Sequence, residues 1–345
     1  MYITKLNLQN FKSYVNQDFE FKRITLLTGL NGAGKSSIFQ SLRMFRQLLE
    51  NGHPVINQYG ELNTLNNKNI RNKIFTLTLY IENKEAYKIN HDSKDNLTTT
   101  EGTIDSIKNI NFAYISANRL GPTEFQHIRN ENTIINNNVG VNGEYTLDIL
   151  SKYGEETLPE DFKFAVDKEN ILTHHVEKWL QEISPNIKLA TELNKKMNVA
   201  SFTVNGFTPL NVGFGVSYTL SIIVQLLYSV VLFKLYGTKT VLLIENPEAH
   251  LHPKGQTKLA EFIANITNYG VQIIIETHSD YILDGLRLAV RNEKISQEDT
   301  TLYYLELDSD GNTKVETPKI DKDGFLDYWP ENFFDTSINN KMNLA

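Results

Sequence analysis

The sequence contains no cysteine, and this absence removes several classes of protein at once. Disulfide scaffolds, thiol nucleophiles, Cys-ligated zinc and Cys-bound iron–sulfur clusters all need the missing side chain. An excess of positive charge is also missing, because the formal net charge of the 345 residues is −7. A dedicated polybasic binder of nucleic acid is therefore not expected, although a local basic patch stays compatible with this charge. The 40% of hydrophobic residues indicate a globular protein with one large domain or two modest ones.

Hydrophobic runs long enough to cross a membrane are scarce as well. Residues 1–14 alternate polar and apolar side chains, so they do not form a signal peptide. Residues 220–236 are long and apolar, and by themselves they fit a transmembrane helix or a core helix of a large α/β domain. The run is barely long enough to span a bilayer and contains Ser221, Gln225, Ser229 and Lys234. We therefore expect a core helix, in a cytoplasmic protein without a membrane partner.

Strands and helices alternate along much of the chain, which predicts an α/β fold with a mostly parallel core sheet. Strands are expected at residues 2–9, 17–28, 111–117, 240–245, 271–276 and 301–307, and the continuous apolar run at residues 24–29 is typical of a strand buried on both faces. Helices are expected at residues 38–49, 220–236, 254–268 and 279–292. Residues 74–81 and 86–90 are expected to pair antiparallel, after an Asn-rich loop at residues 51–72.

The pattern changes between residues 122 and 204. Helical stretches are expected near residues 145–153 and 161–183, followed by strands at residues 187–193 and 198–204. We interpret this region as an inserted lobe. The chain has no visible internal repeat and no sustained heptad pattern, so a long coiled coil is not expected.

Residues 29–36 fit the pattern G-x-x-x-x-G-K-[ST] between a predicted strand and a predicted helix. Glycines let the backbone curl so that N–H groups point at phosphate oxygens, and the helix N-terminus adds its positive dipole end. Lys35 supplies a cation for the β- and γ-phosphates, and Ser36 offers a hydroxyl to Mg²⁺. A glycine-rich turn followed by Lys-Ser by chance is the alternative. The candidate nucleotide-binding residues here are Asn31, Gly32, Ala33, Gly34, Lys35, Ser36 and Ser37.

A nucleotide bound by such a loop needs a second anchor for its metal ion at the end of a neighbouring strand. Residues 240–245 supply four apolar residues and then Glu245, which makes Glu245 the second candidate Mg²⁺ ligand beside Ser36. His250 and His252 form an HxH pair that suits zinc, but no third ligand at a suitable spacing is evident. His278 follows the next strand, where it can reach a γ-phosphate or serve a structural role.

A second candidate anion cradle precedes the long apolar helix. Gly213, Gly215 and Ser217 lie at the start of that helix, where backbone N–H groups are exposed. The loop is weak evidence alone, since such turns are common. Its position about 30 residues before Glu245 is that of the signature loop of an ATP-binding cassette, which precedes a buried helix.

These motifs, in this order, resemble the ABC-type ATPase head of the RecF, SMC and OLD nuclease group. The matching segments are NFKSY (10–14), GLNGAGKSS (29–37), IENPEAHLHP (244–253) and ETHSD (276–280). YISANRLGP (114–122) and GFLDYWPENFFD (324–335) resemble a bacterial subgroup with a short C-terminal domain of unknown function. Related proteins of that subgroup occur in phage-defence operons.

The resemblance implies a P-loop NTPase fold with an antiparallel β subdomain and an inserted helical lobe. The implied segments are the N-terminal half of the head (1–122), the inserted lobe (123–204), the C-terminal half (205–307) and a short C-terminal extension (308–345). It also implies a head-to-tail homodimer that holds two ATP molecules between the protomers. One chain would supply Lys12, Lys35, Ser36, Glu245 and His278, and the other would supply the loops at residues 213–217 and 250–253.

Two departures from the family pattern bear on activity. The family's usual catalytic Glu directly follows the metal-binding acid, but this chain has Asn246 there, which cannot accept a proton. Glu248 is a candidate substitute, so we expect slow but real hydrolysis with Lys35, Glu245, Asn246, Glu248 and His278 as catalytic residues. No Gln lies just after the strand at residues 111–117, where the family pattern has one. Asn118 or Arg119 then senses the γ-phosphate, or Arg119 pairs with a nearby carboxylate.

Nuclease motifs are absent from the sequence. An OLD-type nuclease needs a further Toprim domain with clustered carboxylates, so we expect any nuclease to be a partner in trans. The Asp308–Gly311 segment is better explained as a hairpin turn than as a metal-binding DxD. DNA contact, if any, is expected from two small basic groups, which contain Lys68, Arg71 and Lys73 and then Arg287, Arg291 and Lys294.

Three functions compete at this point. The first is an ATP-hydrolysing sensor subunit in anti-phage defence that works with an effector nuclease. The second is an ATP-gated clamp or scaffold with little turnover, in which Asn246 prolongs the ATP state. The third is a RecF/SMC-like DNA repair ATPase. A transporter cassette is less expected, because residues 244–253 and 324–335 do not resemble that branch.

Overall fold

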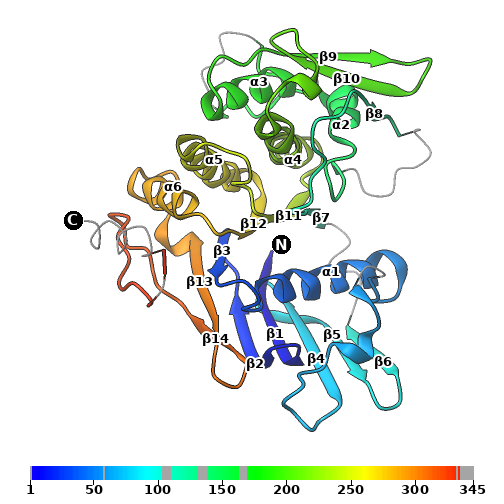
Figure 1. Ribbon diagram of the computed structural model, residues 1–345, viewed down its shortest axis with the longest axis vertical. Coiled ribbons are helices and arrows are strands. Elements are labelled where there is room, and N and C mark those ends of the chain that lie inside the picture. Colours follow the sequence, from blue (N-terminus) through cyan, green and yellow to red (C-terminus); the bar gives the residue numbers. More distant parts are fainter. Residues whose placement is uncertain are drawn as a thin grey trace. The chain divides into compact units, whose positions relative to one another are not determined.

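The chain passes from one folding unit to a second and then returns to the first. The computed structural model describes residues 2–56, 59–102, 110–129, 138–162, 169–331 and 333–334 (Figure 1). Unit 1 comprises Met1–Ile110, Gln297–Asp321 and Phe325–Ala345, and unit 2 comprises Asn111–Ser296 and Lys322–Gly324. The finer division at residues 122, 204 and 307 stays a prediction beside these two units.

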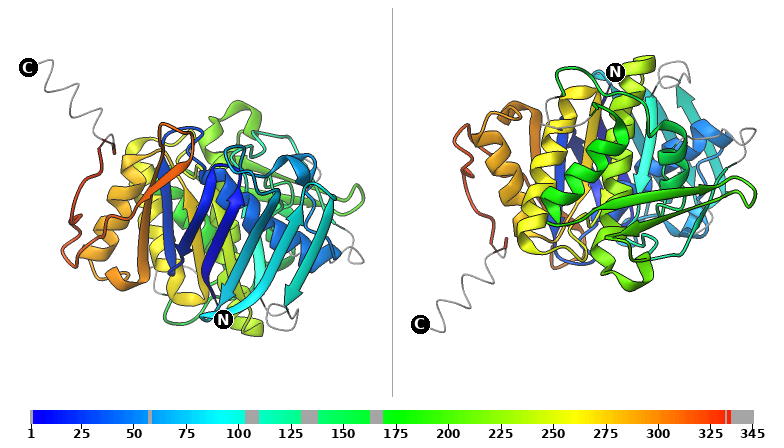
Figure 2. Two further views of the ribbon diagram at one scale, coloured as in Figure 1. Left: turned by 90° about the horizontal axis from the view of Figure 1, so that it is seen from below. Right: turned by 90° about the horizontal axis from the view of Figure 1, so that it is seen from above.

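Unit 1 contains an antiparallel sheet in the order β2-β1-β4-β5-β6 (Figure 2, left). Its strands are β1 (Ile3–Phe11), β2 (Tyr14–Glu20), β4 (Ile74–Ile81), β5 (Lys84–Asp92) and β6 (Leu97–Gly102). Burial alternates along β1, where Leu6 and Leu8 are fully buried, so one face of the sheet covers the core. The predicted β4–β5 pair is confirmed. Strand β6 was not predicted, because its mostly exposed polar side chains carry no apolar alternation.

The alternating strand expected over residues 17–28 is wrong in its bounds, because the chain turns within it, whereas the buried strand expected at residues 24–29 is confirmed as β3 (Ile24–Gly29). Strand β2 ends at Glu20, and β3 begins only at Ile24. In the turn the Phe21 N–H donates to the Thr4 carbonyl oxygen at 2.9 Å, and the Lys22 N–H donates to a Thr25 hydroxyl at 3.3 Å. These bonds direct the polar residues of the turn outward and start a new, fully buried strand.

The other strands of unit 1 position the phosphate loop. Strand β3 pairs in parallel with β13, which pairs antiparallel with β14. The Asp308 carboxylate accepts the N–H groups of Asp310 and Asn312 at 2.9 and 2.8 Å, so the predicted hairpin turn is confirmed. The remaining elements of unit 1 are β3 (Ile24–Gly29), α1 (Lys35–Asn51), η2 (Leu62–Thr64), η7 (Gln297–Asp299), β13 (Thr300–Leu307) and β14 (Thr313–Glu316).

Unit 2 contains strands in the order β12-β11-β7, with helices between them along the chain. Strands β11 and β12 are parallel and place Glu245 opposite Glu276, so both strands end at the same edge. The alternation of strands and helices confirms the predicted α/β class. The elements are β7 (Ile110–Ile115), α4 (Phe214–Tyr236), β11 (Lys239–Glu245), α5 (Pro253–Ile266), η6 (Thr267–Tyr269), β12 (Val271–Glu276) and α6 (Asp280–Arg291).

Helix α4 is apolar all round and lies inside unit 2. It is the one described helix that is long and apolar enough to cross a membrane, and 83% of its most apolar window is buried. It contacts α2, α3, α5 and β11, so the predicted core helix is confirmed. The helix begins at Phe214 rather than at residue 220, which places Gly215 and Ser217 inside its first turns.

The lobe of unit 2 contains α2 (Thr146–Tyr153), α3 (Leu172–Ile183) and a three-stranded sheet in the order β8-β10-β9. The helix expected from residue 161 begins at Leu172, and residues 163–168 lie outside the described part of the chain. Ile171 instead pairs with Thr157 in an extended bridge, which prevents an earlier start. The remaining elements are β8 (Gln126–His127), β9 (Leu189–Asn194), β10 (Val199–Val204) and η5 (Pro209–Asn211).

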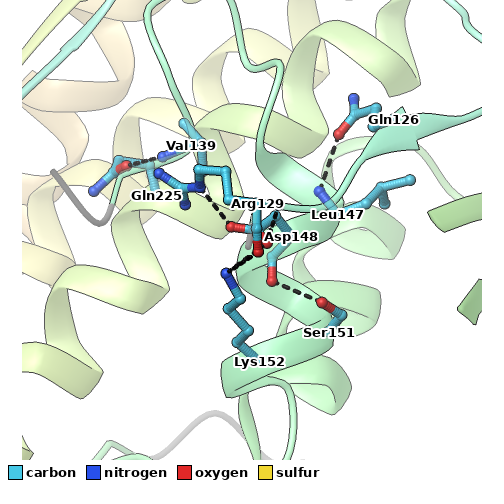
Figure 3. Close-up of polar contacts among 8 residues, drawn as sticks. All are labelled: Gln126, Arg129, Val139, Leu147, Asp148, Ser151, Lys152 and Gln225. Atoms are coloured by element: carbon cyan, nitrogen blue, oxygen red, sulfur yellow. Dashed lines mark hydrogen bonds and ion pairs between the residues drawn. The ribbon is translucent and has the colours of Figure 1, made fainter. Parts of the chain in front are cut away.

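A buried carboxylate of α2 pairs with the segment that follows β8 in this lobe (Figure 3). Asp148 is fully buried and pairs with Arg129 Nε at 2.7 Å and with Lys152 Nζ at 2.8 Å. Gln126 of β8 accepts the Leu147 N–H at 3.0 Å. Because a buried charge is costly unless it is paired, these two cations account for Asp148 in the interior.

Candidate functional site

The phosphate loop of unit 1 has the backbone that its glycines permit. Gly32 and Gly34 have φ values of 80° and 104°, which L-residues with a Cβ rarely adopt. A Cβ on Gly34 would also lie 2.7 Å from the Tyr14 and Thr313 hydroxyl oxygens. The turn is closed by a bond of 3.2 Å from the Ala33 N–H to the Leu30 carbonyl oxygen. The loop therefore has the curled geometry expected of an anion cradle.

Side chains from β2 and β14 hold this loop from behind. The Tyr14 hydroxyl donates to the Gly34 carbonyl oxygen at 3.0 Å, and the Thr313 hydroxyl donates to the Ala33 carbonyl oxygen at 3.0 Å. Ser13 and Thr313 share a further bond of 2.6 Å. Sequence reasoning missed Tyr14 and Thr313, since hydroxyl contacts to main-chain oxygens follow no fixed spacing.

Lys35 begins α1 and lies over the loop. It is 3% exposed, and its Nζ donates to the Gly29 and Leu30 carbonyl oxygens at 2.9 Å each. The first turn of α1 contains no acidic residue, so the cation and the helix dipole act on the same region without opposition. Among the other predicted nucleotide-binding residues of the loop, Asn31, Gly32 and Ser36 are exposed, and Ala33 and Ser37 are buried.

Lys12 lies in the turn between β1 and β2, beside the residues that hold the loop. Its N–H donates to the Leu65 carbonyl oxygen at 2.7 Å, and its backbone has a φ of 52°. Partial burial lowers the pKa of its ammonium group. Lys12 is thus part of unit 1 with the phosphate loop, and a nucleotide contact by its side chain stays a prediction.

In unit 2, Glu245 ends strand β11 with both carboxylate oxygens oriented by donors. The Tyr114 hydroxyl donates to one oxygen at 2.9 Å, and the Ala117 N–H donates to the other at 2.9 Å. Both donors come from β7 and the segment that follows it. These bonds fix the carboxylate direction, as neighbouring donors do around metal-ligating carboxylates. Tyr114 was also missed from the sequence.

Arg119 lies beneath the same turn, where it hydrogen-bonds main-chain oxygens rather than a carboxylate, and a γ-phosphate contact by Arg119 stays a prediction. It is 2% exposed, and its guanidinium donates to the carbonyl oxygens of Ser116, Glu245 and Asn246 at 3.0, 2.7 and 2.6 Å. Burial lowers the pKa of this guanidinium to about 10, although Glu248, Tyr218 and Glu245 act in the opposite direction. Its hydrogen bonds thus go to main-chain oxygens rather than to a carboxylate.

The turn after Glu245 brings two predicted site residues together. Asn246 adopts a left-handed φ of 43°, and its N–H donates to the Glu276 carbonyl oxygen at 2.8 Å. Glu248 Oε1 accepts the N–H of His278 at 2.9 Å, while the buried Oε2 has no hydrogen-bond partner in the described chain. His278 is exposed. The Glu248 carboxylate, with one oxygen still able to accept a hydrogen bond, therefore contacts the main chain of His278 at the end of β12.

The two loops expected to act on a partner protomer also lie together in unit 2. A Cβ on Gly215 would be 2.7 Å from the His250 carbonyl oxygen, so only glycine allows α4 to approach this loop. Gly213 is the N-cap residue and has open space around it, while Ser217 is half-buried. The ring of Phe214, which is 53% exposed, lies 5.5 Å from that of His250.

The contacts of His250 and His252 do not favour zinc. The His250 ring packs edge-on against Tyr218 at 4.7 Å, and His252 caps α5 by accepting the Lys254 N–H at 3.3 Å. Within the described residues, no group of three or more His, Cys, Asp or Glu side chains is placed to hold a metal ion. Zinc is therefore not part of the site that the structure supports.

The two basic groups considered for DNA differ in their contacts. Lys68, Arg71 and Lys73 are exposed on unit 1. Arg287 of unit 2 donates to the Gly324 carbonyl oxygen at 2.8 Å and to Asp284 at 2.7 Å, which gives it a structural role. Arg291 and Lys294 are exposed.

Comparisons with known proteins agree with this geometry. A family model described as "AAA domain, putative AbiEii toxin, Type IV TA system" matches residues 24–284, over half of the chain. A second model, "Protein of unknown function (DUF3696)", matches residues 295–344. The search of curated proteins returns no match.

Solved structures show the same fold. An SMC head bound to the C-winged helix domain of ScpA is similar at 16% identity with a TM-score of 0.59, over 93% of this chain and 99% of that one. An SMC head with an extended coiled coil, bound to the C-terminal domain of ScpA derived from Pyrococcus furiosus, gives 15% identity and a TM-score of 0.58 over 99% of both chains. The chain therefore belongs to the AbiEii-type AAA family of P-loop ATPases, and it has the fold of the ABC-type ATPase head that its motifs predict.

Proposed function

We propose that this protein binds and slowly hydrolyses ATP, and that it does so as a regulatory subunit of an anti-phage defence system. The phosphate loop carries the proposal. It combines left-handed glycines, a buried lysine and a helix N-terminus whose first turn has no acid. These features together favour a polyphosphate over other anions.

Magnesium fits the donors that each unit offers. Ser36 is exposed at the start of α1 in unit 1, and Glu245 is an oriented carboxylate in unit 2. Mg²⁺ typically takes one or two carboxylates together with substrate phosphates and water, so no dedicated cluster of acids is needed. The ion would neutralise charge on the phosphates. We assign Ser36 and Glu245 as its ligands.

Hydrolysis also needs a group that orients the attacking water. We assign this role to Glu248 rather than to Asn246. Glu248 has a carboxylate oxygen that the chain leaves without a donor, and it contacts the main chain of His278, the candidate γ-phosphate sensor. The Asn246 side chain is an amide and cannot accept a proton. A substitute base displaced by two residues is consistent with slow turnover.

A head-to-tail homodimer is implied by the family resemblance, and the packing of unit 2 supports it. The loops at residues 213–217 and 250–253 are packed on each other through Gly215, so they can act as one surface. Phe214 is exposed beside that surface. ATP would join two copies through this surface, and hydrolysis would release them. We propose that such a protein acts in the cytoplasm, because α4, the one helix among the described residues that is long and apolar enough to cross a membrane, is largely buried.

The description of the matching family supports a role in defence, because it names a toxin of a toxin–antitoxin system. We propose that an effector protein, most simply a nuclease, acts in trans under control of the ATP state. Exposed Lys68, Arg71 and Lys73 offer a small basic surface for DNA. If they contact phosphates, duplex affinity should fall between about 50 and 200 mM salt.

An ATP-gated scaffold is the second candidate, and Asn246 favours it. An amide in the position of the usual base would lengthen the life of the ATP-bound dimer. The two functions predict the same binding and the same dimer but different turnover.

Phosphate release from the purified chain with saturating MgATP, together with its mass with and without ATP, tests the proposal. Lys35→Ala should abolish turnover, whereas Lys84→Ala, an exposed lysine of unit 1, should leave it unchanged. ATP-dependent dimers without turnover above the K35A level would establish the scaffold instead. A wild-type chain that neither binds ATP nor turns it over would disprove both functions.

A further inference from the structure

Arg119 is a buried cation whose position the proposed chemistry does not explain. Its guanidinium bonds are with three carbonyl oxygens, and its buried Nε has no hydrogen-bond partner in the described chain. Burying a charge without a bonded carboxylate is costly, so a cheaper apolar side chain would suit a purely packing role. The buried guanidinium of Arg119 is therefore better explained by a functional role than by a contribution to stability.

Two of the carbonyl oxygens that Arg119 holds belong to a left-handed turn of the site. Glu245 and Asn246 are consecutive, and Asn246 has a left-handed φ of 43°. Such a turn relaxes unless its neighbours hold it. The planar fork of a guanidinium binds two adjacent acceptors at once, at 2.7 and 2.6 Å here. A lysine ammonium also has more than one donor, but its N–H groups rotate about a single nitrogen and therefore fix the two acceptor directions less rigidly than a planar guanidinium.

The shape of this turn determines where the next residues lie. The Ala249 N–H donates to the Asn246 carbonyl oxygen at 3.1 Å, and Glu248 between them contacts the His278 N–H. A change in the Asn246 peptide would therefore move the Glu248 carboxylate. On its other side, the guanidinium lies 5.3 Å from the centre of the Tyr218 ring, which is in the first turns of α4.

We propose that Arg119 is a positioning residue that holds the Glu245–Asn246 turn in its left-handed form and ties it to the start of α4. It sets the place of Glu248 without touching the nucleotide. This inference rests on the proposed ATPase function for its kinetic consequence, but the hold on the turn is a property of unit 2 alone. Because Arg119 also contacts Tyr218, a shift of the start of α4 would change the position of the turn.

Arg119→Gln and Arg119→Lys test this, with Arg129→Lys as the matched control. Arg129 is another largely buried arginine of unit 2, and its partner is Asp148 (Figure 3). We expect R119Q to lower kcat by about a hundredfold and to change the KM for ATP by less than about threefold, because phosphate binding belongs to unit 1. R119K should recover part of the loss. R129K should keep kcat per folded molecule within about twofold.

Equal losses of kcat in R119Q and R129K, or an unchanged kcat in R119Q, would overturn the inference. Amide hydrogen exchange without nucleotide separates its failure from failure of the proposed function. R119Q should speed exchange at Asn246 and Ala249 by about tenfold or more, and R129K should not. If exchange at these two amides is unchanged in R119Q, Arg119 does not hold the turn, whether or not the wild-type protein hydrolyses ATP.

Discussion

The side chain that orients the attacking water can be identified by replacing Asn246 and Glu248 separately, provided that the backbone is respected. Asn246 has a φ of 43°, where a residue with a Cβ other than Asn or Asp costs roughly 1–2 kcal/mol. Asn246→Ala would therefore distort the turn and remove the amide together. Asn246→Gly removes the amide and keeps the turn, so it isolates the contribution of the side chain.

Glu248→Gln is the corresponding change at the second position. Its amide oxygen can still accept the His278 N–H, which now lies 2.9 Å from Glu248 Oε1, so the local fold is retained. A positioned general base contributes about 10²–10⁴-fold, and E248Q should lower kcat by this factor. N246G should lower kcat by less than about tenfold, because an amide only assists orientation. Neither change should weaken ATP binding, which we assign to residues 29–36.

Single-turnover phosphate release and a fluorescent ATP analogue measure the two quantities. The reverse order, in which N246G is about a hundredfold slower and E248Q stays within about tenfold of wild type, would refute the assignment of Glu248. N246A supplies an internal check on the backbone argument. Its free energy of unfolding should be about 1–2 kcal/mol smaller than that of N246G, so its denaturation midpoint should lie at a lower denaturant concentration. Equal midpoints would show that the left-handed turn stores no strain.

Three further predictions concern glycines and pH. Gly34→Ala should weaken ATP binding at least about tenfold by calorimetry, since its Cβ meets two hydroxyl oxygens at 2.7 Å, whereas Gly32→Ala adds only backbone strain. Gly215→Ala should destabilise unit 2 by about 1–3 kcal/mol in denaturant melts, because its Cβ meets a carbonyl oxygen at 2.7 Å, and Gly213→Ala, in open space, should be neutral. Burial lowers the pKa of His175 to about 4, from 6.5 in the unfolded chain. The unfolded chain then binds the extra proton, so stability is complete above pH 6.5 and falls by on the order of 3 kcal/mol towards pH 4. His175→Gln should reduce the dependence of the free energy of unfolding on pH between 6.5 and 4. An unchanged dependence would show that His175 is not its source.

The parts of the fold that the sequence predicted well are those with a local signal. The phosphate loop has a fixed spacing, and strand β11 is a continuous apolar run that ends in an acid. Helix α4 combines length with apolarity, and the polar residues within it distinguish a core helix from a membrane span. Each of these features is written within about 25 consecutive residues, where propensity and periodicity apply directly.

The parts that could not be predicted depend on contacts between distant residues. Tyr114 orients Glu245 from another strand, and Thr313 supports the phosphate loop from the far end of the chain. Arg119 was considered from the sequence, but its acceptors could not be predicted, because every residue has a main-chain carbonyl and no residue type marks the ones that accept. Strand β6 escaped notice because a sheet edge can be completed by polar residues whose only shared property is an available backbone.

The parallel pairing of β3 with β13 has a consequence during synthesis. The register joins Ile24 to Thr300, so β13 is made roughly 270 residues after the strand that precedes the phosphate loop. At about 5–20 residues per second, the nascent loop waits for roughly tens of seconds before its supporting strand leaves the ribosome. Unit 2, whose segments are nearly contiguous, can fold during that interval. A chain interrupted after Ser37 but before Thr300 would carry the complete phosphate-loop motif without this neighbouring strand. The loop therefore lacks the support of β13 until that strand has been synthesised.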